Sequence, residues 1–224
     1  LSMIFVIRPE PGLQATLQLA REMGLAAIGM PLFEVMPLAW KPPEPGGFDA
    51  VLLGSANAVR HGGVALDKYR ELPVHAVGKV TAEAAREAGF DVDRTGEGGL
   101  QNVLDDNEVP TRYLRLGGVE KVPLTPGHHT ITARDVYEVR ALPITGSAQI
   151  GLRTGQSCIL LHSAAAARHF RGEIDRLGFD RGAIRLACIG ARVAAAAGDG
   201  WQACQSAPQP DDHALLALAR DMCH

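Results

Sequence analysis

Two patterns alternate along most of this 224-residue chain: short apolar runs and alanine-rich stretches. The apolar runs show little of the polar alternation of half-buried strands, which is typical of parallel strands covered by helices on both faces. They predict strands over residues 3–8, 50–54, 74–78, 113–116, 158–161 and 186–190. The alanine-rich stretches predict helices over residues 11–23, 56–62, 80–88, 164–177, 192–197 and 211–222. This alternation restricts the chain to an α/β fold with right-handed crossovers.

The sequence also contains an internal repeat. Residues 51–61 resemble residues 159–169, and residues 75–82 resemble residues 187–194. Each copy has a strand, a serine and a helix, followed by a strand, a glycine and a helix. Because both matches occur in the same order and at similar intervals, we expect two similar α/β lobes.

Two exposed, alternating segments flank the first copy of the repeat and indicate where the chain passes between the lobes. Residues 33–41 continue into a linker rich in proline and glycine, and residues 134–142 end at Pro143. These segments could pair as an antiparallel ladder that joins the lobes. We expect a first lobe of residues 1–36 plus 143–224, a second lobe of residues 47–136, and linkers at residues 37–46 and 137–142.

Charge and composition disfavour several kinds of partner. The 22 basic and 25 acidic residues give a net charge of −3, which argues against a protein held on nucleic acid by its overall field. Aromatic residues make up 5% of the chain, so a stacking platform for bases is not indicated. No apolar run approaches the ~18 to 20 residues that span a bilayer, and the start lacks the features of a signal peptide. We expect a cytoplasmic protein with no nucleic-acid or membrane partner.

The remaining short motifs predict neither a metal site nor a cofactor. The four cysteines lie far apart without a C-x-x-C pair. His128-His129 lies among turn-forming residues without an acid at ligand spacing, so we expect a solvated hairpin turn there. The glycine-rich residues 96–99 match neither a P-loop nor a dinucleotide fingerprint, which favours a plain loop. Ser163 follows His162 without a G-x-S-x-G elbow, so a hydrolase triad is disfavoured.

The strongest chemical signal is the serine or glycine at each strand-to-helix turn. Such turns place unpaired helix N-terminal amides at the carboxyl edge of a parallel sheet, where they can bind anions. Ser55, Thr81 and Ser163 would add hydroxyl donors beside these amides. The alternative is that each hydroxyl only caps its helix. The pattern leaves both interpretations open.

Tyr137 is a further candidate, because it lies in the segment expected to cross between the lobes. Its phenol could donate a hydrogen bond or a proton to a leaving hydroxyl. The simpler alternative is a tyrosine that packs on one edge of an amphipathic strand.

Five motifs occur in an order and at a spacing that resemble the uroporphyrinogen-III synthase family over essentially the whole chain. They are Arg8-Pro9, residues 54–59 (GSANAV), residues 77–82 (VGKVTA), Val136-Tyr137 and Ile189-Gly190. The resemblance implies two flavodoxin-like parallel-sheet lobes joined by a two-stranded antiparallel ladder. It also implies a monomeric enzyme without a cofactor. Its reaction is the cyclisation of hydroxymethylbilane, a linear tetrapyrrole with eight carboxylates, to uroporphyrinogen III in haem biosynthesis, with inversion of ring D and loss of water.

The resemblance also implies roles for single residues. Tyr137 matches the tyrosine thought to assist loss of the hydroxyl. The other matches are substrate-binding positions, and they are Ser55, Thr81, Ser163, Gly190 and Arg8.

Two departures from the family pattern keep other functions open. Val193 stands before Ala194 where the family usually has threonine, so one hydroxyl contact is lost. Residues 119–125 contain Pro123 and are followed by Pro126, so the helix that the family has here should be shortened or replaced by extended chain. The alternatives are a two-lobed module that binds a small anion, and an inactive paralogue that serves as an interaction domain.

Overall fold

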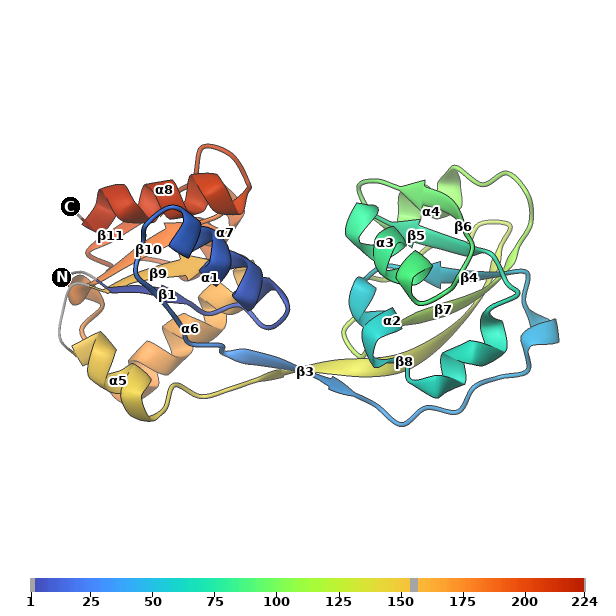
Figure 1. The fold of residues 1–224 in the computed structure, drawn as a ribbon, viewed down its shortest axis with the longest axis horizontal. Helices are drawn as coiled ribbons and strands as arrows, with labels where there is room; N and C mark the ends of the chain where they lie inside the picture. Colours follow the sequence, from blue (N-terminus) through green and yellow to red (C-terminus); the bar gives the residue numbers. More distant parts are fainter. Residues whose placement is uncertain (1–2, 154–156, 224) are drawn as a thin grey trace. The chain divides into compact units, whose positions relative to one another are not determined.

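The computed structural model describes residues 3–153 and 157–223, which form two compact units (Figure 1). Unit 1 comprises Leu1–Glu34 and Arg140–His224, so it contains both ends of the chain. Unit 2 comprises Val35–Val139. Each unit has its own mostly parallel sheet with helices packed against it.

Unit 1 has a five-stranded sheet in which every neighbouring pair is parallel. In spatial order its strands are β11 (Ala203–Ser206), β10 (Ile184–Cys188), β9 (Ser157–Leu161), β1 (Met3–Val6) and β2 (Ala27–Gly29). Its helices are α1 (Gly12–Glu22), α5 (Gly146–Arg153), α6 (Ala164–Leu177), α7 (Ala191–Ala197) and α8 (Asp212–Cys223), with a short 3-10 turn, η3 (Arg181–Ala183).

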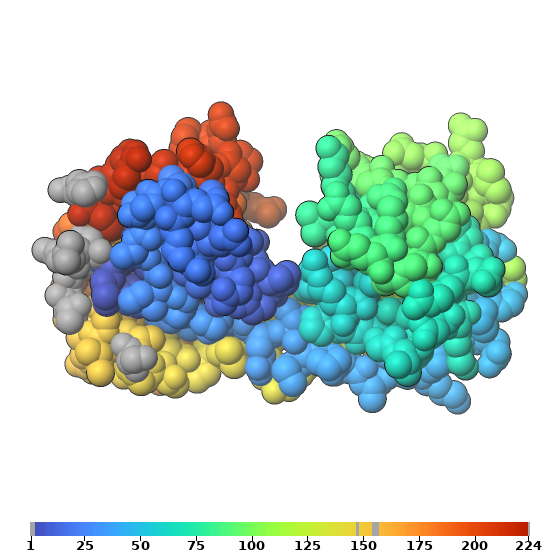
Figure 2. Space-filling model, in the orientation of Figure 1, coloured from blue at the N-terminus to red at the C-terminus, as the bar shows by residue number. Residues whose placement is uncertain are grey.

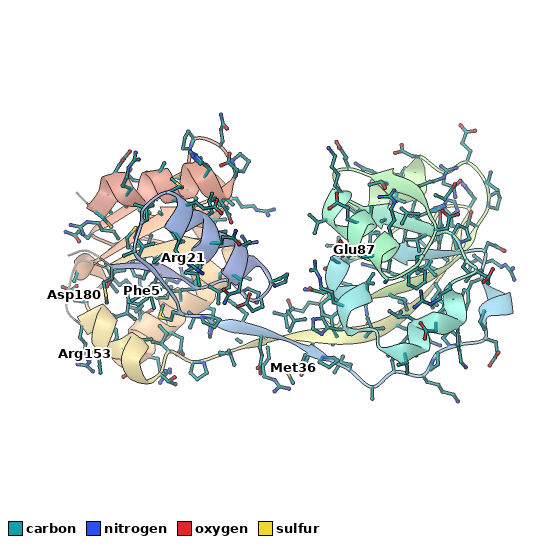
Figure 3. The ribbon with its side chains drawn as sticks, in the orientation of Figure 1. Phe5, Arg21, Met36, Glu87, Arg153 and Asp180 are labelled. Atoms are coloured by element: carbon teal, nitrogen blue, oxygen red, sulfur yellow. The ribbon has the colours of Figure 1, made fainter. Side chains whose placement is uncertain are left out.

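Alternate residues of β1 enter two separate cores in unit 1. Ile4 and Val6 pack with residues of α1 and α8 on one face. Phe5, labelled in Figure 3, packs on the other face with residues of α5, α6 and α7. The space-filling view (Figure 2) shows the blue segment that contains α1 and the red segment that contains α8 on the reader's side of unit 1. Burial on both faces explains why the central strands are continuously apolar.

Unit 2 contains most of a six-stranded sheet. In spatial order its strands are β3 (Phe33–Pro37), β8 (Thr130–Ala141), β7 (Arg112–Gly118), β4 (Ala50–Leu53), β5 (Val74–Val77) and β6 (Val92–Gly96). Its helices are α2 (Ala56–His61), α3 (Lys79–Glu87) and α4 (Leu100–Asp105), with 3-10 turns η1 (Pro45–Gly47) and η2 (Val64–Tyr69). Residues of α2, η2 and α3 form the larger core on one face, and α4 covers a smaller core on the other.

An antiparallel pair of strands, β3 and β8, links the two sheets. The Leu38 amide donates to the Val136 carbonyl at 2.9 Å, and the Leu142 amide donates to the Leu32 carbonyl at 2.8 Å. β8 is also parallel to β7. The predicted fold class, two parallel-sheet lobes joined by a two-stranded antiparallel ladder, is therefore confirmed.

The segment between β7 and β8 contains one confirmed prediction and one error. Residues 119–129 form no helix, as the prolines predict. The hairpin expected at His128-His129 is wrong, because β7 and β8 are parallel and not antiparallel. His129 is not solvated either: it is 7% exposed, and its Nδ1 accepts a hydrogen bond from the Thr111 amide at 3.2 Å. His128 is exposed, and its Nε2 lies 2.9 Å from the Asn107 carbonyl.

Candidate functional site

Each sheet has a point at which the order of its strands reverses. In unit 2 the chain proceeds from β4 through β5 to β6, and then β7 adds to the opposite side of β4. In unit 1 the corresponding reversal lies between β1 and β9. Open α/β sheets bind ligands at the carboxyl ends of the strands at such a reversal. These two edges are therefore the first candidates for a site.

A cavity of about 390 Å³ lies at the reversal point of unit 2. That volume falls in the lower part of the range of small-molecule sites. The residues that matter for its chemistry come from the ends of β4 and β7, from the segment after β7, and from β8. They are Gly54, Ser55, Arg115, Gly118, Lys121 and Tyr137.

Ser55 caps helix α2 just after the C-terminal end of β4. Its Oγ accepts a hydrogen bond from the Asn57 amide at 3.2 Å, which satisfies one of the free amides of the first turn. The hydroxyl can still donate a hydrogen bond elsewhere, because a serine oxygen both donates and accepts. Gly54, just before it, allows the Leu100 side chain to approach the strand end closely, because a Cβ at position 54 would lie 2.8 Å from Leu100 Cδ1. Ser55 is therefore both a helix cap and a lining residue of the cavity.

The Tyr137 ring lies against Gly118, its register partner on β7. A Cβ at Gly118 would come within 2.7 Å of Tyr137 Cε2, so only glycine leaves room for the ring in this position. The pairing slips between Gly117 and Gly118, and such a bulge re-aims the side chains beside it. Within residues 3–153 and 157–223, the Tyr137 phenol oxygen has no hydrogen-bond partner.

Two cationic side chains line the same cavity. Arg115 is buried within β7, and its Nη2 donates to the Val122 carbonyl at 2.9 Å; burial lowers the pKa of this guanidinium. Lys121 forms an ion pair with Asp135. Its pKa is also lowered, first by burial and then by the charge of Arg115. His61, whose ring centroid is 6.3 Å from that of Tyr137, has a pKa lowered by burial, which favours its neutral form.

Thr81, another predicted site residue, is buried in the first turn of α3 and is not part of the cavity lining. The helix begins after Gly78, whose φ of +76° is in the region that favours glycine. Unit 2 therefore brings Ser55 and Tyr137 to one cavity and leaves Thr81 outside it.

In unit 1, Arg8 takes part in a partly buried polar cluster. Its Nη1 donates to Asp212 Oδ2 at 3.0 Å and to Thr16 Oγ1 at 3.3 Å. The Thr16 hydroxyl donates to Asp212 Oδ2 at 2.7 Å, and His162 Nε2 lies 3.2 Å from Asp212 Oδ1. The bonds from His162 and Thr16, together with the charge of Arg8, lower the pKa of Asp212 to about 2. Gly12 gives the guanidinium its space, because a Cβ there would lie 2.4 Å from Arg8 Nε.

The other predicted residues of unit 1 begin helices. Ser163 caps α6, and its Oγ accepts from the Ala166 amide at 3.1 Å. Gly190 precedes α7, which has no side-chain cap. Val193 is 5% exposed and belongs to the core. The cavity of about 300 Å³ found in unit 1 is lined by none of these residues.

Sequence reasoning missed three charged residues near the candidate sites, Arg115, Lys121 and Asp212. The readable signal for Arg115 was a lone charge inside the apolar run Tyr113–Leu116. Asp212 could not be found from a local pattern, because 204 positions separate it from Arg8.

A family model described as uroporphyrinogen-III synthase HemD matches residues 14–217. The chain belongs to the uroporphyrinogen-III synthase family. This confirms the resemblance seen in the sequence motifs. No curated protein matches the sequence.

Two solved structures of uroporphyrinogen-III synthases share the fold. The synthetase from Helicobacter pylori superposes with a TM-score of 0.71 at 18% identity, covering 99% of this chain and 100% of that one. A mutant synthase from the extremely thermophilic bacterium Thermus thermophilus gives a TM-score of 0.55 at 15% identity, with 98% of each chain covered.

The described part of the chain contains neither a cluster of metal ligands nor a membrane-spanning helix. In residues 3–153 and 157–223, no three His, Cys, Asp or Glu side chains are grouped so that they could hold a metal ion. None of the helices in the same ranges has the length and apolar character needed to cross a bilayer.

Proposed function

We propose that this chain cyclises hydroxymethylbilane to uroporphyrinogen III, with inversion of ring D and loss of water, in haem biosynthesis. The observation that carries the proposal is the family match over residues 14–217. The chemistry of the unit 2 cavity agrees with it, because a polycarboxylate substrate calls for cationic and hydrogen-bonding groups beside a proton donor.

Tyr137 is the proposed acid of this reaction. A phenol is a hydrogen-bond and proton donor, and that of Tyr137 is not engaged by another described residue. In the first step its proton passes to the hydroxyl oxygen of the substrate, the carbon–oxygen bond breaks, and water leaves. Ring D attacks the cationic methylene carbon through the carbon that already carries its bridge, which gives a spiro intermediate. The old bridge bond then breaks, the bridge carbon bonds to the free α-carbon of ring D, and the proton lost from that carbon restores the Tyr137 phenol. The protein's main task is to hold the chain in a conformation that allows this turn, and positioning of this kind can give large rate gains.

The proposed substrate-binding groups are distributed over the strand ends. In unit 2, Ser55 supplies a hydroxyl at the cavity, and the first turn of α3 at Thr81, which lies outside that cavity, supplies donors for another part of the substrate. In unit 1, Ser163 and Gly190 open helices α6 and α7. Arg8 is also a proposed substrate-binding residue. Asp212 already holds its guanidinium, so a substrate carboxylate would have to share it with Asp212.

The proposal includes a monomeric, cytoplasmic enzyme that needs no cofactor. Sedimentation of the purified chain, with and without substrate, tests the first part. Dialysis against a chelator tests the last, since activity lost and then restored by one metal would refute it.

The test of the function itself is the identity of the product. Purified protein is incubated with hydroxymethylbilane, the mixture is oxidised, and the porphyrin isomers are separated by chromatography. Spontaneous closure occurs without inversion and gives the type I isomer, whereas we expect mainly type III with the protein. Binding of the substrate without a change in isomer ratio would favour the anion-binding module, and neither binding nor conversion would favour the inactive paralogue.

A further inference from the structure

Arg115 is a charged residue in a buried part of unit 2. It is 9% exposed and lies within β7 between Leu114 and Leu116, which are core residues. Arginine is almost never buried to this extent unless it is paired, because a charge is costly to remove from water. A buried guanidinium in a strand therefore needs a partner.

No protein carboxylate supplies that partner among the residues that the structure describes. The one hydrogen bond of Arg115 is from Nη2 to the Val122 carbonyl. Arg112, three residues earlier on the same strand, is different: its Nη2 lies 2.6 Å from Asp49 Oδ1, and its Nε also bonds that carboxylate. The contrast shows that an arginine on this strand can have an acidic partner within the protein, which Arg115 lacks.

The acids near Arg115 are either engaged or exposed. Asp135 forms an ion pair with Lys121 and so balances that charge. Glu120 lines the cavity but is exposed and forms no salt bridge with Arg115 in the described part of the chain. Burial is the main cause of the lowered pKa of Lys121, and the positive charge of Arg115 lowers it further.

Two donors of the Arg115 guanidinium have no described protein partner. Its Nε and Nη1 make no hydrogen bond to a described residue, and neither is among the described buried polar atoms that lack a partner. Both donors are therefore accessible to solvent, and Arg115 lines the cavity together with Tyr137. A guanidinium presents such donors as a planar fork that matches the two oxygens of a carboxylate.

We propose that Arg115 binds one acetate or propionate carboxylate of the substrate in the unit 2 cavity and so positions the tetrapyrrole beside Tyr137. The assignment rests on the proposed function for the identity of the substrate. The cavity volume suits one carboxylate arm with its pyrrole ring, and the remaining carboxylates bind elsewhere.

The variants Arg115→Gln and Arg115→Lys test the assignment. Glutamine removes the charge and the fork, whereas lysine keeps the charge and loses the fork. Arg112→Gln is the matched control, because Arg112 lies on the same strand, is exposed, and does not line the cavity. The readouts are KM and kcat for hydroxymethylbilane and the dissociation constant of the octacarboxylate porphyrin uroporphyrin III.

We expect Arg115→Gln to raise the dissociation constant and KM about tenfold to a hundredfold, the range of one charge-assisted hydrogen bond. Arg115→Lys should give an intermediate value, and Arg112→Gln should match the unsubstituted protein. Unchanged binding in a folded Arg115→Gln protein would overturn the assignment. If that protein does not fold, the Arg115 Nε–H resonance of the unsubstituted protein decides: it should shift on titration with uroporphyrin III, and no shift would overturn the proposal.

These outcomes separate the assignment from the proposed function. Type III product from a chain whose Arg115→Gln variant binds normally would refute the role of Arg115 and leave the function intact. Porphyrin binding that depends on Arg115, in a chain that makes no type III product, would support the carboxylate site and refute the synthase activity.

Discussion

The substitution Gly118→Ala moves the Tyr137 ring without altering the phenol itself. The new Cβ would lie 2.7 Å from Cε2 and 2.9 Å from Cζ of the ring. Carbon atoms in contact are normally ~3.5 to 4.0 Å apart, so the ring has to move by roughly 1 Å. Gly118 does not have a positive φ, so the substitution adds a clash and no backbone strain.

The size of the effect follows from that displacement. Overpacking of this kind typically lowers the free energy of unfolding by ~1 to 3 kcal/mol. A misplacement of about 1 Å in a catalytic geometry can reduce turnover by ~100-fold. If Tyr137 is the acid, we therefore expect kcat for type III formation to fall by about 10- to 100-fold, with a smaller change in KM.

Gly47→Ala is the control for this experiment. It adds the same methyl group in η1 of unit 2, away from the cavity lining, where no heavy atom lies within 4 Å of the new Cβ. Turnover and the urea midpoint should be measured for both variants at one pH. Equal turnover in the Gly118→Ala and Gly47→Ala proteins would refute the argument that the position of the Tyr137 ring matters.

Three further predictions concern single side chains. Tyr137→Phe should lower kcat far more than it raises KM, because the phenol acts in the transition state. An unchanged kcat would show that Tyr137 serves only to pack against its neighbours. Tyr113→Phe removes the hydroxyl that lies 2.8 Å from His75 Nδ1, so the urea midpoint should fall by the equivalent of about 1 to 3 kcal/mol while turnover is unaffected. Glu173 and Asp212 both have a pKa lowered to about 2, by bonds from Arg176 and from His162 respectively. The stability that each ionised carboxylate gives the fold is complete above its usual pKa, 4.5 for Glu173 and 3.8 for Asp212, and is lost as pH falls toward 2. The urea midpoint should therefore decline over that pH interval, and it should decline less in the Glu173→Gln protein.

The central strands of both sheets were predictable because they are buried on both faces. β9 and β10, for example, consist almost entirely of core residues. The edge strands β2, β6 and β11 were missed, since each is short and partly exposed and carries no continuous apolar run. Edge strands pack on fewer neighbours, so burial places weaker demands on their sequence.

The candidate site was predictable where one strand end gave a local signal. Ser55 follows an apolar strand directly, and Tyr137 lies in a segment with clear alternation. The association of Tyr137 with Gly118 was not readable, because it depends on the register of β7 against β8 and on the bulge between them. The ion pair of Arg8 with Asp212 joins the two ends of the chain, and no local pattern reports such a contact.

The most direct test of the account is a titration of hydroxymethylbilane with increasing amounts of the purified chain. Spontaneous closure competes with the enzyme, so the fraction of type III isomer should rise with protein concentration until type III is nearly the sole product. The Tyr137→Phe protein at the same concentrations should leave much more type I. A fraction of type III that stays at the protein-free value at every concentration would contradict the synthase activity.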